Sequence, residues 1–251
     1  MAKKVPAQTK RQAIREQRLR RQRQQRIAII GGIVVVALII AGILIAPSIY
    51  EAMAPVGEIV QITPAAHSMV DGNALGPVDA PVVVEVYSDF QCPACRSFSA
   101  DIEPQIVQNY VETGQVRYVY RHFPFLDDRV AGNESDQAAN ASMCAAEQGR
   151  FWDYHDILFA NWNGENRGAF SDRRLEAFAE ALGLDMGAFR QCFNENRFED
   201  QINADLAQGI QAGVQGTPTV FVNGERVGDP GFVPTYEQIS QAIEAGLAAG
   251  G

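Results

Sequence analysis

The apolar positions of this chain fall into two arrangements: one unbroken run near the N-terminus, and many short, interrupted runs after it. The unbroken run covers residues 27–46 (IAIIGGIVVVALIIAGILIA) and carries no charge. In a helix of about 1.5 Å per residue it extends about 30 Å, the thickness of a bilayer core, so we predict one transmembrane helix. The alternatives are a buried core helix and a cleaved signal peptide. A signal's apolar region is usually shorter, about 7–15 residues, although Ala52, Met53 and Ala54 would suit a cleavage site.

The first half of the following body has strand patterns on either side of a helix pattern. A β-branched run of strand length covers residues 81–87, and Val116–His122 is a second strand candidate. Between them, Pro93 stands where a helix would begin. This helix is expected to run toward Tyr110 with a bend near Pro104.

The second half is mostly helical and ends in a hairpin and a helix. The predicted elements are a helical block over residues 134–213 with breaks near 163–168 and 182–187, strands over Thr219–Val222 and 226–227, and a closing helix over 234–247. Asn223 and Gly224 between two apolar runs are a strong hairpin signal. The whole order predicts an α/β fold whose sheet is interrupted by a helical insertion.

Charge divides the chain at the same place as hydropathy. The 251 residues are 47% apolar and 20% charged, which excludes a wholly disordered chain. Residues 1–26 hold ten Lys and Arg against one acid, Glu16, whereas the remainder has no lysine and 29 acids against 11 arginines. A basic tail before a span stays in the cytoplasm and contacts anionic lipid, so the body is expected outside the cytoplasm. RNA binding by the Gln/Arg-rich run is the alternative, but no aromatic residues interleave it, and we expect no nucleic-acid partner.

Two of the four cysteines form the sequence Cys92-Pro93-Ala94-Cys95 at the start of the predicted helix. Thiol–disulfide exchange needs a thiolate, and the unpaired N–H groups and positive dipole end of a helix N-terminus stabilise one. The pKa of a free cysteine, ~8.5, can fall to between ~3.5 and ~7.5 in such a place. Cys92 is therefore expected to be exposed and to attack. Cys95, one turn further in, is expected to resolve the mixed disulfide.

The remaining candidate ligands and aromatic residues are expected to be structural. The alternative reading of the Cys-x-x-Cys spacing is half of a zinc site, which needs about four ligands. His67, His122 and His155 supply no second cluster, and we expect no metal and no cofactor. For His122 and His155, packing is favoured over catalysis. Core packing is the default, and an apolar peptide groove the alternative, for Phe90, Phe98, Phe123 and Phe125.

Three stretches of the body resemble one known family. EVYSDFQCPACRSF, YRHFPF and GTPTVFVNG are similar to the DsbA-type thioredoxin-fold oxidoreductases, in particular their membrane-anchored or secreted bacterial branch. The resemblance extends from about Asn73 to Leu247 and is specific because Cys-Pro-x-Cys is combined with Gly-Thr-Pro-Thr. It implies a thioredoxin fold interrupted by a helical domain. It also implies that Pro218 is cis and faces the cysteines, with the Thr217 backbone available to pair with an extended substrate.

The same resemblance suggests roles for other residues. It places an acid, here Glu85, beneath Cys95, where a buried carboxyl with a raised pKa would take or return the Cys95 proton; a solvated Glu85 at a strand edge is the alternative. It implies a structural disulfide between Cys144 and Cys192, the alternatives being two buried thiols or a second redox pair. The strongest oxidants of this family have a motif that resembles Cys-Pro-His-Cys, whereas this chain has Ala94 in place of the histidine. This difference predicts a milder oxidant.

We therefore divide the chain into a basic cytoplasmic tail (1–26), a transmembrane helix (27–46), a linker with a short first strand over residues 58–63 (47–72) and a thioredoxin-like domain (73–250) with its insertion at about 130–213. The predicted activity is oxidation of thiols in exported proteins, followed by reoxidation by a membrane redox partner. A disulfide isomerase or reductase and a non-catalytic membrane-tethered chaperone are the alternatives.

Overall fold

The computed structural model describes residues 7–53, 56–67, 69–127 and 132–250 of the chain, which divides into two units, Met1–Pro55 and Val56–Gly251. In the first unit, helix α1 runs over Ala7–Met53. It contains one segment, Ile14–Ala46, that is long and apolar enough to cross a membrane, judged by length and composition alone. The predicted linker boundary at Pro47 is not a helix end, because a proline can kink a helix without ending it.

A mixed six-stranded sheet in the order β1-β2-β4-β3-β5-β6 forms the centre of the second unit. Its middle strands, β3 (Val82–Ser88) and β4 (Val116–His122), are parallel, and β5 (Thr219–Val222) is antiparallel to β3. These strands match the predicted ones to within a residue. Parallel pairing places the carboxyl ends of β3 and β4 at one edge, where the Cys-x-x-Cys segment begins.

Short hairpins form both sides of the sheet. At Asn223 and Gly224, φ is +49° and +81°, as a tight hairpin turn requires, and β6 covers Glu225–Arg226, one residue earlier than predicted. The hairpin of β1 (Val70–Asp71) and β2 (Ala74–Leu75) was not predicted, although its two turn residues, Gly72 and Asn73, are a hairpin signal.

The strand predicted over residues 58–63 is wrong. Residues 56–67 have no regular structure in the described part of the chain. Instead, the Asn161 side chain both accepts from the Val60 N–H (2.8 Å) and donates to the Val60 carbonyl (2.9 Å). The backbone groups of Val60 are thus satisfied by an amide side chain in place of a neighbouring strand.

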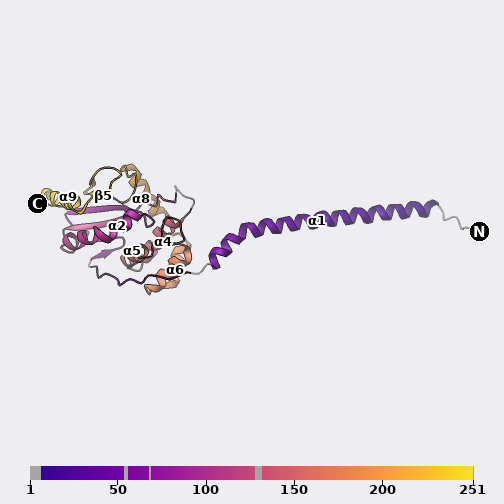
Figure 1. Cartoon of the computed structure of the whole chain (residues 1–251), viewed down its shortest axis with the longest axis horizontal. Helices are drawn as coiled ribbons and strands as arrows, with labels where there is room; N and C mark the ends of the chain where they lie inside the picture. Colours follow the sequence, from indigo (N-terminus) through magenta and orange to yellow (C-terminus); the bar gives the residue numbers. More distant parts are fainter. Residues whose placement is uncertain (1–6, 54–55, 68, 128–131, 251) are drawn as a thin grey trace, which may run out of the picture. The chain divides into compact units, whose positions relative to one another are not determined.

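The helices follow the predicted order. After β3 come α2 (Pro93–Asp101), α3 (Glu103–Ile106) and the π-helix η1 (Val107–Val111). The helix is interrupted at Ile102, because Pro104 has no N–H to donate to the preceding turn. The insertion consists of α4 (Glu134–Ala146), α5 (Phe151–Ala160), α6 (Asp172–Ala181), α7 (Met186–Asn194) and α8 (Glu199–Gln211). Helix α9 (Tyr236–Gly250) closes the unit (Figure 1).

The two faces of the sheet are covered unequally. On one face, Val84, Val86, Tyr118 and Tyr120 are fully buried in the main core. The other face is covered by α8, where Gly209 lies so close to Phe123 and Tyr87 that an added Cβ would be 2.7 Å from the Phe123 ring. Alternate residues of β4 on this second face are only half-buried. On the same face of β3, Val83 and Glu85 are also only half-buried.

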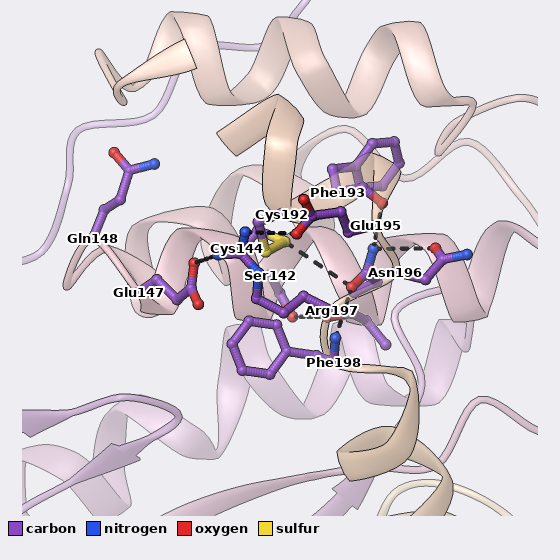
Figure 2. The surroundings of a disulfide bond; sticks show 12 residues. Ser142, Cys144, Glu147, Gln148, Cys192, Phe193, Glu195, Asn196, Arg197 and Phe198 are labelled. Atoms are coloured by element: carbon purple, nitrogen blue, oxygen red, sulfur yellow. Dashed lines mark hydrogen bonds and ion pairs between the residues drawn. A yellow bond between two sulfur atoms is a disulfide. The ribbon is translucent and has the colours of Figure 1, made fainter. Parts of the chain in front are cut away.

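A disulfide joins α4 and α7 through Cys144 and Cys192, whose Cα atoms are 5.8 Å apart (Figure 2). Both residues are buried. Arg197 lies nearby and forms ion pairs with Glu147 and Glu195, at 2.7 and 2.8 Å. The pair implied by the family resemblance is thus bonded, and the bond lies within the insertion.

Candidate active site

The Cys-x-x-Cys segment starts where β3 ends. After Ser88 the chain turns, and the Cys92 N–H donates to the Asp89 carbonyl at 3.0 Å. Cys92 is the N-cap of α2 and Pro93 lies in its first turn. Proline suits this place because its fixed φ is helical and its missing N–H would have no partner in the helix. The sulfur of Cys92 therefore lies at the N-terminus of α2, as predicted.

Both active-site cysteines are free thiols in this structure, and Cys92 is less exposed than expected. The residue is 6% exposed, against 1% for Cys95. Its sulfur donates to the carbonyl of Thr217 at 3.3 Å, and the Thr217–Pro218 peptide bond is cis, as the resemblance implied. The segment before Pro218 thus contacts the Cys92 sulfur directly and contributes to its burial. This contact reduces the part of the sulfur that another molecule can reach.

The surroundings of Cys92 favour its charged form. A hydrogen bond from the Cys95 thiol has the largest effect on Cys92 and lowers its pKa; burial opposes it. Thr217 and the N–H groups of Cys95 and Ala94 lower it further, so that the pKa of Cys92 is about 6. Burial, with the neighbouring Cys92, raises the pKa of Cys95 well above its ordinary value. The pair therefore consists of one acidic thiol and one thiol that keeps its proton.

Ala94 and Thr217 also affect the Cys92 sulfur, although neither side chain can carry a charge. Ala94 acts through its backbone N–H. The hydroxyl oxygen of Thr217 is buried and has no hydrogen-bond partner within the described ranges, which leaves it available to donate to a Cys92 thiolate.

Glu85 is not beneath Cys95, so its expected role as a proton relay is corrected. Side chains alternate along a strand, and Ser88, which hydrogen-bonds Cys95, points to the opposite face from Glu85. The Glu85 carboxylate accepts from the Arg121 Nε at 2.8 Å, and Arg121 also pairs with Asp205 of α8 at 3.1 Å. About a quarter of the Glu85 side chain (24%) is exposed. Arg121 thus joins Glu85 in the sheet to Asp205 in the insertion.

The buried acids on the cysteine side are Glu103 and Asp89, which were not predicted. Burial raises the pKa of Glu103, whose carboxylate accepts from the Tyr118 hydroxyl at 2.7 Å and lies 3.8 Å from His155. Among the described residues, one group of side chains could hold a metal: Glu103, His155 and Asp156, whose ligand atoms lie within 4.8 Å. These atoms already contact one another and Tyr118.

The histidines and phenylalanines named from the sequence are mostly packed. Burial lowers the pKa of His122 to about 3, so it is neutral. Burial disfavours charge on His155 as well, but Glu103 and Asp156 outweigh it and raise its pKa. Phe90 stacks on Tyr120 with ring centroids 5.1 Å apart, and Phe98 and Phe123 are buried; Phe125 is half-buried. Core packing, the default reading, describes the three buried rings.

The fold and the site together define a thioredoxin-fold protein whose Cys-x-x-Cys pair begins a helix and faces a cis-proline. A family model described as thioredoxin matches residues 68–245, and the chain belongs to this family. Oxidised BdbD from Bacillus subtilis superposes with a TM-score of 0.62 and 25% identity, over 76% of this chain and all of that one. Wolbachia pipientis α-DsbA1 superposes with a TM-score of 0.59 and 23% identity, over 73% and 94%. The predicted fold class and the relation to DsbA-type proteins are confirmed.

Two curated relatives differ in how much of their length is matched. Probable disulfide bond formation protein D of Bacillus cereus is 28% identical over 179 residues, which are 70% of this chain and 78% of that protein. Na(+)/H(+) antiporter NhaA 3 of Salinispora tropica is 38% identical over 174 residues, which are 69% of this chain. The chain spans about a quarter of that antiporter's length (24%).

Proposed function

We propose that this protein is a thiol–disulfide oxidoreductase that uses Cys92 and Cys95 to oxidise thiols in other proteins. The observation that carries the proposal is the unequal pair at the N-terminus of α2, in which the pKa of Cys92 is about 6 and that of Cys95 is raised. A stabilised thiolate favours the reduced form of the enzyme, which makes its disulfide an oxidant. The name of the Bacillus cereus relative, a probable disulfide bond formation protein, supports the same chemistry.

In the oxidised enzyme, a substrate thiolate attacks the Cys92 sulfur. A bond forms between these two sulfurs, the Cys92–Cys95 bond breaks, and Cys95 leaves and takes up a proton. The second substrate thiolate attacks the first substrate sulfur and releases Cys92 as a thiolate. Two electrons have then passed from the substrate to the enzyme. The backbone of Thr217, beside the Cys92 sulfur, would pair with an extended substrate and hold its sulfur in line.

The apolar part of α1 would anchor the catalytic unit, with the basic tail (1–26) in the cytoplasm and the body outside it. The substrates would then be thiols of exported proteins. A membrane redox partner would have to accept the two electrons and restore the disulfide.

The test is a pair of variants in the full chain. Cys92→Ser is expected to abolish oxidation of a dithiol peptide, whereas Cys95→Ser is expected to trap mixed disulfides. A non-catalytic chaperone would keep its activity in Cys92→Ser. The reduction potential decides direction: a value near ~−270 mV, that of thioredoxin, would reverse the assignment in favour of a reductase.

A further inference from the structure

Asp89 is a buried carboxyl in the turn that leads to Cys92, and thiol–disulfide exchange as described above does not use it. The residue is 2% exposed, and its backbone carbonyl accepts from the Cys92 N–H. Its hydrogen-bond donors among the described residues are all neutral. A buried acid in such surroundings is uncommon, because burial disfavours the charged form.

The carboxylate of Asp89 accepts hydrogen bonds from three separate segments. One oxygen accepts from the Gln91 N–H at 2.8 Å and from the Ser135 hydroxyl at 2.7 Å. The other accepts from the Leu126 N–H at 3.2 Å. These donors belong to the active-site turn, the first turn of α4 and the loop after β4, so one side chain binds all three together.

Gln91, which is fully buried, extends these contacts. Its side-chain amide donates to the Ser135 hydroxyl at 2.9 Å and to the Asp127 carboxylate at 3.0 Å. The backbone carbonyl of Gln91 accepts from the indole N–H of Trp162 at 2.7 Å, and Trp162 lies just after α5. The turn before Cys92 is therefore attached to the insertion at two places.

The charge of Asp89 depends on its surroundings and on Cys92. Burial raises the pKa of Asp89 to about 7, the three donors oppose this rise, and the Cys92 thiolate adds to it. Within the described ranges, the other titratable groups around it are Tyr120 of β4, which burial keeps neutral, and Asp127 beyond Gln91. Coupling between two ionising groups is reciprocal, so an ionised Asp89 disfavours the Cys92 thiolate to the same extent.

We propose that Asp89 is a positioning residue that regulates the charge on Cys92. Through Asp89, the charge on Cys92 also affects the strength of the hydrogen bonds that attach the active-site turn to the insertion. With the disulfide formed, Cys92 has no charge and the ionised Asp89 holds its three donors. When a substrate dithiol delivers two electrons, the Cys92–Cys95 bond breaks, Cys95 takes one proton and Cys92 remains a thiolate. Its charge draws a further proton from solvent onto Asp89. A protonated carboxyl is the weaker acceptor, so the reduced enzyme holds the turn less tightly.

This inference rests on the proposed function for the source of the electrons, but its test needs no substrate. The reduced full chain in detergent is titrated through the ultraviolet absorbance of the Cys92 thiolate. Asp89→Asn removes the charge and keeps the shape, and is expected to lower the midpoint and to replace a two-step titration by a single step. Asp205→Asn is the matched control, because Asp205 is 3% exposed and also accepts from a backbone N–H, but contacts Arg121 on the other face. It is expected to leave the midpoint unchanged.

A second variant and a second measurement keep the test decisive if Asp89→Asn does not fold. Ser135→Ala removes one donor to the carboxylate without changing any charge, and is expected to move the Asp89-linked step of the titration to higher pH. Reduction of the wild type near pH 7 is expected to take up more protons than reduction of Asp89→Asn, as measured from the slope of the reduction potential against pH. An unchanged midpoint in a folded Asp89→Asn, or an equal shift in Asp205→Asn, would overturn the inference. Loss of activity in Cys92→Ser would still support the proposed function.

Discussion

Removal of the Cys144–Cys192 bridge should destabilise the catalytic unit by an amount that follows from the chain it closes. The two cysteines are 48 positions apart, and a closed loop of that length constrains the unfolded chain by about 4 kcal/mol. Because both sulfurs are buried, truncation also loses packing worth about 1 kcal/mol for each residue. For a unit of this size, the bridge alone corresponds to a fall in melting temperature of roughly 8–16 °C.

The assay is urea unfolding of the full chain followed by fluorescence of Trp152 and Trp162, which both lie in the insertion. Cys92 and Cys95 are replaced by serine throughout, so that no free thiol exchanges with the bridge. Each single alanine variant already breaks the bond, so either Cys144→Ala or Cys192→Ala should lower the free energy of unfolding by about 5 kcal/mol, and the double variant should lower it by only about 1 kcal/mol more. The loop-closure reasoning would be refuted if the free energy of unfolding of the double variant lay within about 1 kcal/mol of that of the bridged protein. It would also be refuted if the double variant lost the sum of the two single losses.

Four other predictions concern the reacting pair, Thr217 and Glu85. Alkylation of the reduced protein by iodoacetamide, followed by mass spectrometry, should modify Cys92 with a midpoint near pH 6 and leave Cys95 unmodified at neutral pH; a midpoint near 9 would contradict the environment described. Because the pKa of Cys92 is lowered by folding, its contribution to the stability of the reduced form should be full above the unfolded pKa, near 9, and be lost as pH falls toward 6, which melting curves would show. Thr217→Val, which removes the hydroxyl beside the sulfur, should raise the Cys92 midpoint, with Thr217→Ser as the control that retains it. Glu85→Gln should cost about 1 kcal/mol of unfolding free energy through Arg121 and leave the Cys92 midpoint unchanged; a shifted midpoint would restore Glu85 to the site.

The elements that the sequence predicted well are those with strong local patterns. The strands β3, β4 and β5 have four to seven residues rich in valine and aromatic side chains, and the start of α2 follows from Pro93. The strands β1 and β2 have two residues each, too few to show a period. Residues 58–63 look like a strand locally, but their partner is the Asn161 side chain, 101 residues away from Val60 in sequence.

The sequence predicted the residues of the site that belong to its two motifs, and it did not predict the acids around them. Cys92, Cys95 and the cis-proline lie together as the motifs indicated. Glu85 was misplaced because a shift of one position along a strand reverses the face, and Val86 is the residue that shares the buried face with Ser88. Asp89 was missed because its partners Leu126 and Ser135 are 37 and 46 residues distant, a juxtaposition that no local pattern reports.

The two-residue strands at the margins of the sheet have a consequence for contacts between this sheet and other polypeptides. β1 and β6 leave few backbone groups free to pair with another molecule, and they carry Asp71, Glu225 and Arg226. Arg226 also donates to the Gly213 carbonyl (2.5 Å). Short, charged margins discourage edge-to-edge aggregation. A second polypeptide therefore has little opportunity to extend the sheet from either side.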